Sequence, residues 1–549
     1  MTLSKDWRVT MSTLNVLRSS ARLFGAVGFV LVSTTAQSAH AQAFADAKKA
    51  LVDYTKSDIA PRASCESLSA FKSDGVTQIQ SRLVPAAAAA PAYCRVSGVI
   101  APEIGFDVLL PAMWNGRFYM LGNGGLAGDD LNAANSVNQR VDGVRNGFVT
   151  AQTNTGHDSR KEPSGTFVLS NPQKAIDYAY RAVHETTTLA KKIATAYYDK
   201  APQFSYWNSC SNGGRQGLIE AQRYPDDYDG IVANAPWVNQ TGFTLGAMWN
   251  QRAVDAAPLS NEKLALVSKA VYAKCDGLDG LKDGLIDDPR ACRFDPARDV
   301  PACKAGQDGA DCLTAAQATA FTKVYGGVVS GGKQVFPGYM VGSEALTTGR
   351  GGQPASNWSG MIVPPAAGRA AADFNLAEGI MKYLVFEPPQ PNYDYKTFDF
   401  DKDRALLERW GKLANANNPD LSAFNKRGGK LIMTYGWADP ILQPMMGVNY
   451  YEEAIKKNGS KTPDFFRLFM VPGMSHCSGG IGPDQHDPVT AVVNWVEKGK
   501  APDTIIASKV VNGQPTRTRP LCAYPKVARY TGKGSIDDAA NFRCEAPKK

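Results

Sequence analysis

The stretch FSYWNSCSNGGRQG, residues 204–217, decides the fold of this chain of 549 residues. Its apolar start, residues 204–208, predicts a strand, and a helix is expected after the turn that contains two glycines. A sharp strand-to-helix turn with a serine at its apex is the arrangement of a nucleophile elbow, usually written G-x-S-x-G, and here the serine is Ser211. Ser209 stands where the first glycine is usual, so the motif is imperfect. The alternative is an ordinary capped start of a helix.

Strands and helices alternate along most of the chain. Strands are expected at 106–110, 118–121, 148–152, 230–233, 430–435 and 465–471, and helices at 173–198, 448–456 and 489–498. Such alternation predicts an α/β fold whose core is a mostly parallel sheet covered by helices on both faces. The pattern is lost over residues 239–426, which are rich in Gly and Pro. We interpret this segment as a lid inserted into a core that consists of residues 42–238 and 427–549.

The later part of the core offers partners for Ser211. Asp439 follows the strand at 430–435, and His476 follows the strand at 465–471. This order predicts a catalytic triad in which Ser211 is the nucleophile, His476 the base and Asp439 the residue that orients the base. The other histidines are less suitably placed: His40 precedes the core, His184 lies mid-helix, where a structural role is expected, His157 lies at a strand end, where it could touch a substrate, and His486 lies in a loop that we expect to be solvated.

The N-terminus has the features of an export signal. Four basic residues within the first 22 positions precede a short apolar run, and Ala39-His40-Ala41 has the form of a cleavage site. We therefore expect residues 1–41 to be removed and the protein to be secreted or periplasmic. No apolar run is long enough for a membrane span.

The net charge of +8 is mild for this length, and no basic cluster is interleaved with aromatic residues, so nucleic acid is not expected as a partner.

The chain has ten cysteines, and in an exported protein most of them should be paired. Local loop closures are expected for Cys65–Cys94, Cys275–Cys292, Cys303–Cys312 and Cys522–Cys544. The remaining two are Cys210, directly before Ser211, and Cys477, directly after His476. A disulfide holds its Cα atoms about 5.5 Å apart, so a bond between these two would bring the serine and the histidine together. The alternative is that both are free or that they pair elsewhere.

Residues 276–287, DGLDGLKDGLID, form an acidic loop with glycines at regular positions. Carboxylate and carbonyl oxygens at close spacing are ligands of calcium. The spacing is not that of an EF-hand, and the loop lacks the bidentate Glu of that motif. Because Cys275 and Cys292 flank the loop, we expect a structural calcium ion at the base of the lid, not a catalytic metal. The alternative is a plain series of Asp-Gly turns.

These motifs together resemble those of the tannase/feruloyl esterase family, which also contains the bacterial mono(2-hydroxyethyl) terephthalate hydrolases. The resemblance covers roughly residues 65–544. It rests on CSNGGRQG at 210–217, Asp439, His476-Cys477, the loop at 276–285 and YRAVHET at 180–186. It implies an α/β-hydrolase core with an inserted lid, a Cys210–Cys477 disulfide and a structural calcium ion.

The resemblance also implies roles for individual residues. The calcium ligands would be the side chains of Asp276, Asp279 and Asp283 and the carbonyls of Leu281 and Leu285. An oxyanion hole would be formed by the backbone N–H groups of Asn212 and of a glycine in the turn at 122–125, where Gly125 is favoured over Gly124.

The activity that the resemblance implies is hydrolysis of a small ester of an aromatic acid, such as ferulate, gallate or chlorogenate, through an acyl-enzyme. A terephthalate half-ester is the alternative substrate. Two different classes of protein compete with this interpretation: a non-catalytic, calcium-stabilised binding protein and a metallohydrolase. Trp358, Tyr383 and Phe386 either form a stacking wall for the aromatic substrate or belong to the core of the lid.

Overall fold

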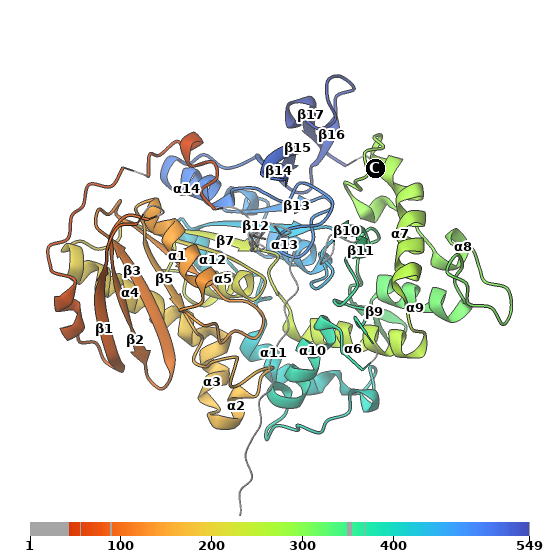
Figure 1. The fold of residues 1–549 in the computed structure, drawn as a ribbon, viewed down its shortest axis with the longest axis horizontal. Helices are drawn as coiled ribbons and strands as arrows, with labels where there is room; N and C mark the ends of the chain where they lie inside the picture. The colour runs from red at the N-terminus through yellow and green to blue at the C-terminus, as the bar shows by residue number, and fades with distance from the viewer. Residues whose placement is uncertain (1–42, 55, 88–89, 349–353, 367, 548–549) are drawn as a thin grey trace, which may run out of the picture. The chain divides into compact units, whose positions relative to one another are not determined.

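A nine-stranded sheet forms the centre of the fold (Figure 1). The computed structural model describes residues 43–54, 56–87, 90–348, 354–366 and 368–547, so the expected signal at 1–41 lies outside the described residues. The strand order is β1-β2-β3-β5-β4-β6-β7-β12-β13. The strands are β1 (Val76–Val84), β2 (Tyr93–Ile100), β3 (Ile104–Pro111), β4 (Arg117–Leu121), β5 (Val149–Thr153), β6 (Phe204–Cys210), β7 (Gly230–Asn234), β12 (Lys430–Gly436) and β13 (Phe466–Val471).

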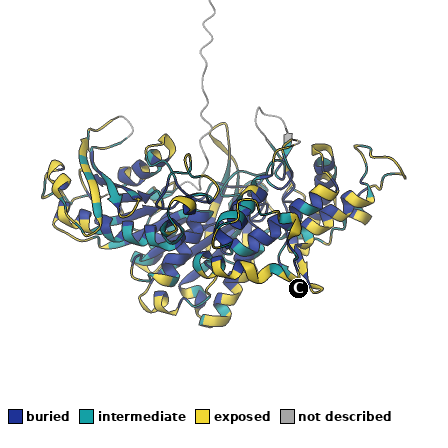
Figure 2. Cartoon of the chain, turned by 90° about the horizontal axis from the view of Figure 1, so that it is seen from below, coloured by how far each residue is buried: buried dark blue, intermediate teal, exposed yellow. Residues whose placement is uncertain are grey.

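The sheet is parallel from β5 to β13, whereas β1, β2, β3 and β5 pair antiparallel. The parallel strands β5, β7 and β12 are buried on both faces (Figure 2). This is why β7 and β12 are nearly continuous apolar runs in the sequence, whereas β5 also contains Thr150, Gln152 and Thr153. In β4, for example, Met120 belongs to one hydrophobic cluster and its neighbour Tyr119 to another. The predicted α/β core with a mostly parallel sheet is therefore confirmed.

Helices cover both faces of this sheet. On the face of Met120 lie α4 (Ala182–Tyr198), α5 (Asn212–Arg223) and α13 (Met445–Asn458). The face of Tyr119 is covered by α14 (Pro488–Lys498), and α1 (Ala134–Arg145) packs on Leu109 of β3. Before α4, the short helices α2 (Phe167–Ser170) and α3 (Gln173–Ile176) lead into a π-helical turn, Asp177–Arg181. None of the helices among the described residues is both long and apolar enough to cross a membrane.

Between β7 and β12 the chain leaves the sheet, and we call residues 239–426 the insertion. Its elements are α6 (Gln240–Ala256), α7 (Asn261–Cys275), α8 (Pro296–Asp299), α9 (Ala315–Gly326), β8 (Val328–Ser330), β9 (Lys333–Phe336), β10 (Leu346–Thr348), β11 (Pro354–Ser356), α10 (Ala372–Gly379), α11 (Glu408–Ala414) and α12 (Ser422–Lys426). Part of the insertion has a hydrophobic cluster of its own. Trp358 is fully buried in this cluster, and its Nε1 donates to Ser343 Oγ at 2.9 Å. Trp358 is thus a core residue and not a wall for a substrate.

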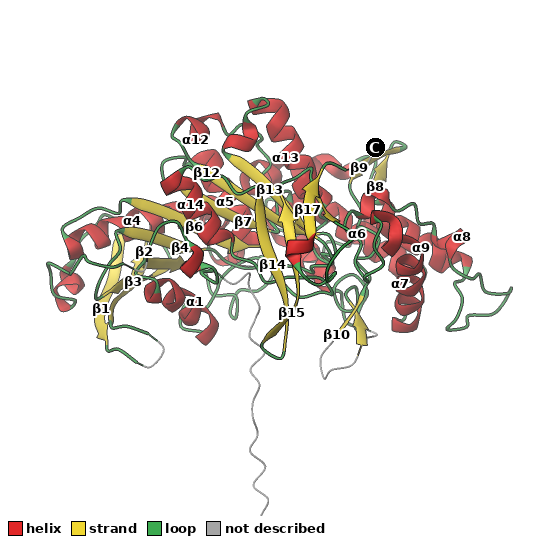
Figure 3. Ribbon diagram, turned by 90° about the horizontal axis from the view of Figure 1, so that it is seen from above, coloured by secondary structure: helices red, strands yellow, loops and turns green. Residues whose placement is uncertain are grey.

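Two antiparallel hairpins follow α14 (Figure 3). They are β14 (Thr504–Val511) with β15 (Gln514–Cys522), and β16 (Val527–Tyr530) with β17 (Phe542–Glu545). Both lie in the segment predicted as the second part of the core, but they form separate two-stranded sheets. Both hairpins contact the acidic loop at 276–287.

Candidate active site

Ser211 occupies a strained turn between β6 and α5. Its backbone has φ +64° and ψ −124°, a conformation that a residue with a side chain adopts only where its surroundings impose it. The N–H of Ser211 donates to the carbonyl of Asn234, and its carbonyl accepts from Trp237 and Arg215, each at 3.0 Å. Gly213 must lack a side chain, because a Cβ there would lie 2.0 Å from Ser209 Oγ. The strained turn of a nucleophile elbow thus forms at Ser211, although Ser209 stands where the motif usually has a glycine.

The glycine turn after β4 packs directly on the start of α5. A Cβ on Gly122 would lie 2.8 Å from the Cα of Gly213. A buried hydroxyl connects the same two segments: Tyr178 Oη lies 3.2 Å from the carbonyl oxygen of Gly125 and 3.0 Å from Asn212 Oδ1. Gly125 and Asn212 are the two residues expected to form the oxyanion hole, and the structure brings them together through one side chain. Tyr178 was not singled out in the sequence.

Asp439 and His476 form a direct hydrogen bond, with 2.7 Å between Asp439 Oδ2 and His476 Nδ1. The other carboxylate oxygen, Oδ1, accepts the backbone N–H groups of Ile441 and Leu442, each at 2.9 Å. Asp439 is fully buried, whereas the His476 side chain is 18% exposed. A carboxylate held in this way fixes the imidazole with its proton on Nδ1, which leaves Nε2 as the basic nitrogen.

A disulfide joins the serine turn to the histidine loop. Cys210 and Cys477 are bonded, with their Cα atoms 5.9 Å apart and 267 residues between them in sequence. Since Ser211 follows the first cysteine and His476 precedes the second, all three expected triad residues belong to one neighbourhood at the carboxyl ends of β6, β12 and β13. All ten cysteines are paired, and the four other bonds are those expected: Cys65–Cys94, Cys275–Cys292, Cys303–Cys312 and Cys522–Cys544.

The acidic loop at 276–287 is closed by its own backbone. Asp276 Oδ1 accepts the N–H of Asp283 at 3.2 Å, and Asp279 Oδ1 accepts that of Leu281 at 2.9 Å. Burial, and to a lesser extent the nearby charges of Asp279 and Asp283, raise the pKa of Asp287 to about 7. Carboxylate and carbonyl oxygens are suitable ligands for the hard cation expected here, but Asp276, Asp279 and Asp283 do not form a group with ligand atoms within 4.8 Å of one another in the described part of the chain.

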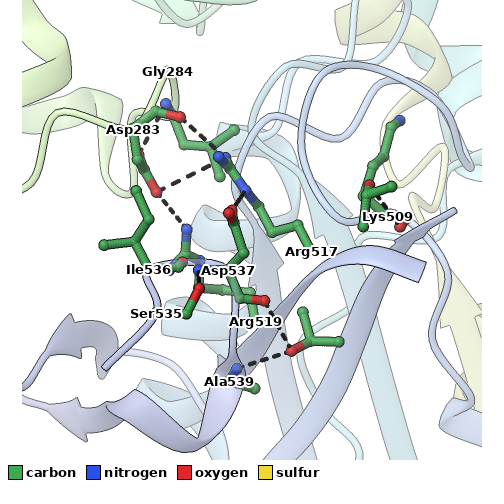
Figure 4. A network of polar contacts seen from close by, with 12 residues as sticks. Asp283, Gly284, Lys509, Arg517, Arg519, Ser535, Ile536, Asp537 and Ala539 are labelled. Atoms are coloured by element: carbon green, nitrogen blue, oxygen red, sulfur yellow. Dashed lines mark hydrogen bonds and ion pairs between the residues drawn. The ribbon is translucent and has the colours of Figure 1, made fainter. Parts of the chain in front are cut away.

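Arginines of the C-terminal hairpins supply positive charge to the acidic loop (Figure 4). Asp283 Oδ2 forms an ion pair with Arg519 of β15, and Arg517 donates to the Asp283 carbonyl at 3.0 Å. Arg529 of β16 donates to the carbonyl of Asp279 at 2.8 Å. These contacts were not predicted from the sequence, because no motif links the loop to residues more than 230 positions later.

Two further histidines are core residues. His157 is 3% exposed and stacks on Phe167 with 4.2 Å between ring centroids. His486, which was expected to be solvated, is also only 3% exposed, so that expectation was wrong. Burial lowers the pKa of each to about 4, and both are therefore neutral near pH 7.

Comparisons with known proteins identify relatives of this chain. The model of the family described as "Tannase and feruloyl esterase" matches residues 88–545. The chain is 34% identical to mono(2-hydroxyethyl) terephthalate hydrolase of Piscinibacter sakaiensis, over 89% of this chain and 92% of that protein. It is 31% identical to feruloyl esterase B of Aspergillus niger, over 80% of this chain and 83% of that protein. The crystal structure of feruloyl esterase B from Aspergillus oryzae superposes with a TM-score of 0.74 at 28% identity, covering 88% of this chain and 99% of that one. The chain belongs to the tannase and feruloyl esterase family, whose members are carboxylic ester hydrolases.

Proposed function

We propose that the protein is a serine esterase for small esters of aromatic carboxylic acids. His476 Nε2 takes the proton of the Ser211 hydroxyl, and the serine oxygen attacks the ester carbonyl. The backbone N–H groups of Asn212 and Gly125 stabilise the oxyanion that forms. The alcohol leaves with the proton from His476, and water then releases the acid from the acyl-enzyme by the same sequence.

The observation that carries this proposal is the Cys210–Cys477 bond combined with the His476–Asp439 hydrogen bond. The first connects the chain neighbours of a serine and a histidine, and the second gives the histidine the tautomer of a general base. A binding protein would need neither a strained serine nor an oriented imidazole, so this arrangement favours catalysis over a non-catalytic binding role.

Covalent labelling tests the proposal. A serine-directed phosphonate should label the wild type stoichiometrically and should fail to label Ser211→Ala. Ser209→Ala, two positions earlier in the same turn, is the matched control and should keep the label. Labelling of Ser211→Ala to the wild-type extent, as measured by intact mass, would contradict the proposed nucleophile.

The substrate class rests on the family and on the named activities of relatives. The main candidates are ferulate, gallate and chlorogenate esters, and a terephthalate half-ester is the second candidate because one relative carries that activity in its name. Turnover of methyl ferulate, methyl gallate, chlorogenate and mono(2-hydroxyethyl) terephthalate, compared by kcat/KM, separates them. Comparable kcat/KM for simple aliphatic esters would contradict an aromatic preference.

Calcium and export are part of the same proposal. Calcium would be held by Asp276, Asp279 and Asp283 and by the carbonyls of Leu281 and Leu285, where it adds charge compensation between the insertion and the C-terminal hairpins. Chelation should lower the melting temperature before it lowers activity, whereas a metallohydrolase would lose its activity at once.

The five disulfides fit an oxidising compartment, secreted or periplasmic. N-terminal sequencing of the mature protein should give a sequence that begins near Gln42.

A further inference from the structure

A second group of chemically active side chains lies at the opposite end of α5 from Ser211. It consists of His184 in α4, Glu220 in α5 and Asp227 in the turn between α5 and β7. One ligand atom from each lies within 4.8 Å of those from the others. His184 Nδ1 is 2.7 Å from Asp227 Oδ2. Glu220 lies eight residues after the first residue of α5, which is about 12 Å along the helix at 1.5 Å per residue, so the group does not belong to the active site.

Glu220 is the unusual member of the group. Its side chain is fully buried, and no N–H or hydroxyl group of the described residues donates to either carboxylate oxygen; the polar group that faces it is the Asp227 carboxyl. A buried carboxylate without donors is costly, and proteins neutralise it with a proton, a cationic side chain or a metal ion. Burial and the charge of Asp227 raise the pKa of Glu220 well above its ordinary value.

The cationic side chain nearest to the group compensates only part of its charge. The Lys191 ammonium donates to the backbone carbonyl of Asp227 and not to either carboxylate. With both carboxylates ionised and Lys191 charged, the group carries one net negative charge. A divalent ion would change this to one net positive charge, so its binding must draw on coordination as well as on charge.

The imidazole of His184 is oriented and reachable. It stacks on Tyr224 with 3.8 Å between ring centroids and an interplanar angle of 7°. Its side chain is 33% exposed, compared with 13% for Asp227. An ion could thus enter from the His184 side and keep water as its remaining ligand there, while Glu220 forms the buried wall.

We propose that His184, Glu220 and Asp227 form a binding site for a divalent transition-metal ion of the zinc type. One imidazole nitrogen and two carboxylate oxygens from three separate elements are a donor set for zinc, and the nitrogen disfavours calcium or magnesium. On binding, the ion takes the place of the hydrogen bond between His184 Nδ1 and Asp227 Oδ2, and the proton of that bond moves to the other ring nitrogen, Nε2. The site is structural, because it connects α4 to α5 and to the turn before β7.

Calorimetric titration of the calcium-replete protein with Zn²⁺ tests this site without using esterase activity. We expect one equivalent of zinc to bind. Co²⁺ should give the visible absorption of a low-coordinate nitrogen and oxygen site. Zinc should also raise the melting temperature of the wild type.

Two variants and one control make the test specific. Glu220→Gln preserves the shape of the side chain and removes its charge, and His184→Gln removes the nitrogen ligand. Loss of a residue that only supports a metal ligand lowers metal affinity about 10- to 100-fold. Each of these variants changes a direct ligand, so each should lower the zinc affinity by at least this factor. Glu185→Gln, beside His184 on α4, is the matched control and should bind like the wild type. If Glu220→Gln folds, as its circular dichroism would show, and binds zinc as the wild type does, or if the wild type binds none, the three side chains do not form a metal site and the proposal is wrong.

Discussion

Replacing Tyr178 with Phe should slow catalysis without preventing folding. The hydroxyl is buried at the junction of three segments: it accepts from Gln240 Nε2 at 2.7 Å and shares its own hydrogen between the Gly125 carbonyl and Asn212 Oδ1. Gly125 and Asn212 are the proposed sources of the oxyanion-hole N–H groups. Tyr178 touches no reacting atom, so it is a positioning residue.

The expected loss of kcat depends on which hydrogen bonds remain after the Tyr178 hydroxyl is removed. Asn212 Oδ1 keeps a donor, Arg215 Nε at 2.7 Å, so the amide at the start of α5 should hardly move. Gly125 loses the hydroxyl that holds its carbonyl, and its N–H should be less well placed. Loss of a whole oxyanion donor costs about 10²- to 10³-fold in kcat, and a donor that is merely loosened should cost less. We expect kcat to fall about tenfold, or about 1.4 kcal/mol, with little change in KM.

Tyr198→Phe is the matched control, since it also deletes a buried hydroxyl that donates to a backbone carbonyl, that of Pro111, at 2.6 Å. Both variants leave a buried partner unsatisfied and should lose about 1–3 kcal/mol of stability. Steady-state hydrolysis of methyl ferulate and thermal unfolding measure the two effects. If Tyr178→Phe keeps the kcat of the wild type while losing stability as Tyr198→Phe does, the hydroxyl is only structural and the reasoning is refuted.

Three further predictions concern the disulfide, the triad and a buried carboxyl group in α10. Joint replacement of Cys210 and Cys477 by Ala opens a loop of 267 residues, so unfolding should become easier by up to about 5 kcal/mol and kcat should fall; full activity of the double variant would show that the bond does not set the site. Asp439→Asn should lower kcat by about 10⁴-fold with an unchanged circular dichroism spectrum, because the amide favours the wrong tautomer of His476; a kcat near that of the wild type would contradict the orienting role. Burial raises the pKa of Asp373 to about 7, so its contribution to stability is lost as pH rises from about 4 to above 7. Relative to the wild type, Asp373→Asn should gain up to about 4 kcal/mol of unfolding free energy over this range, and parallel curves of urea-unfolding free energy against pH would contradict this.

The central sheet could be predicted because its parallel strands are buried on both faces. Strands such as β7 and β12 are almost continuous apolar runs, and their ends were located to within one or two residues. The edge strand β1 was missed because its residues are mostly exposed or half-buried, which leaves no apolar run to detect. The hairpins β14–β15 and β16–β17 were missed for a related reason: β15, for example, is exposed over its first residues and contains two prolines.

The triad positions could be predicted because chemistry limits the residue types and the fold limits their order. Tyr178 could not, because its role depends on a local irregularity. The sequence predicts one helix over 173–198, whereas the structure has a π-helical turn at Asp177–Arg181 within it. Such turns are often found at functional sites, and this one contains the residue that reaches both the glycine turn and α5. No periodicity in the sequence marks it.

Helix α5 explains how the strain at Ser211 is maintained. Residues 212–221 are all buried, and Gly213, Gly214 and Gly217 allow contact distances that a Cβ would prevent, on Ser209, on the Asn234 carbonyl and on Trp207. A residue with positive φ persists only where its surroundings leave no other conformation open to it, so a helix that cannot shift is a requirement of the site. The disulfide fixes the strand before the turn, and the proposed metal would fix the far end of the helix. Because the serine turn joins this strand to this helix, removing either restraint should relax the turn, although neither touches the ester.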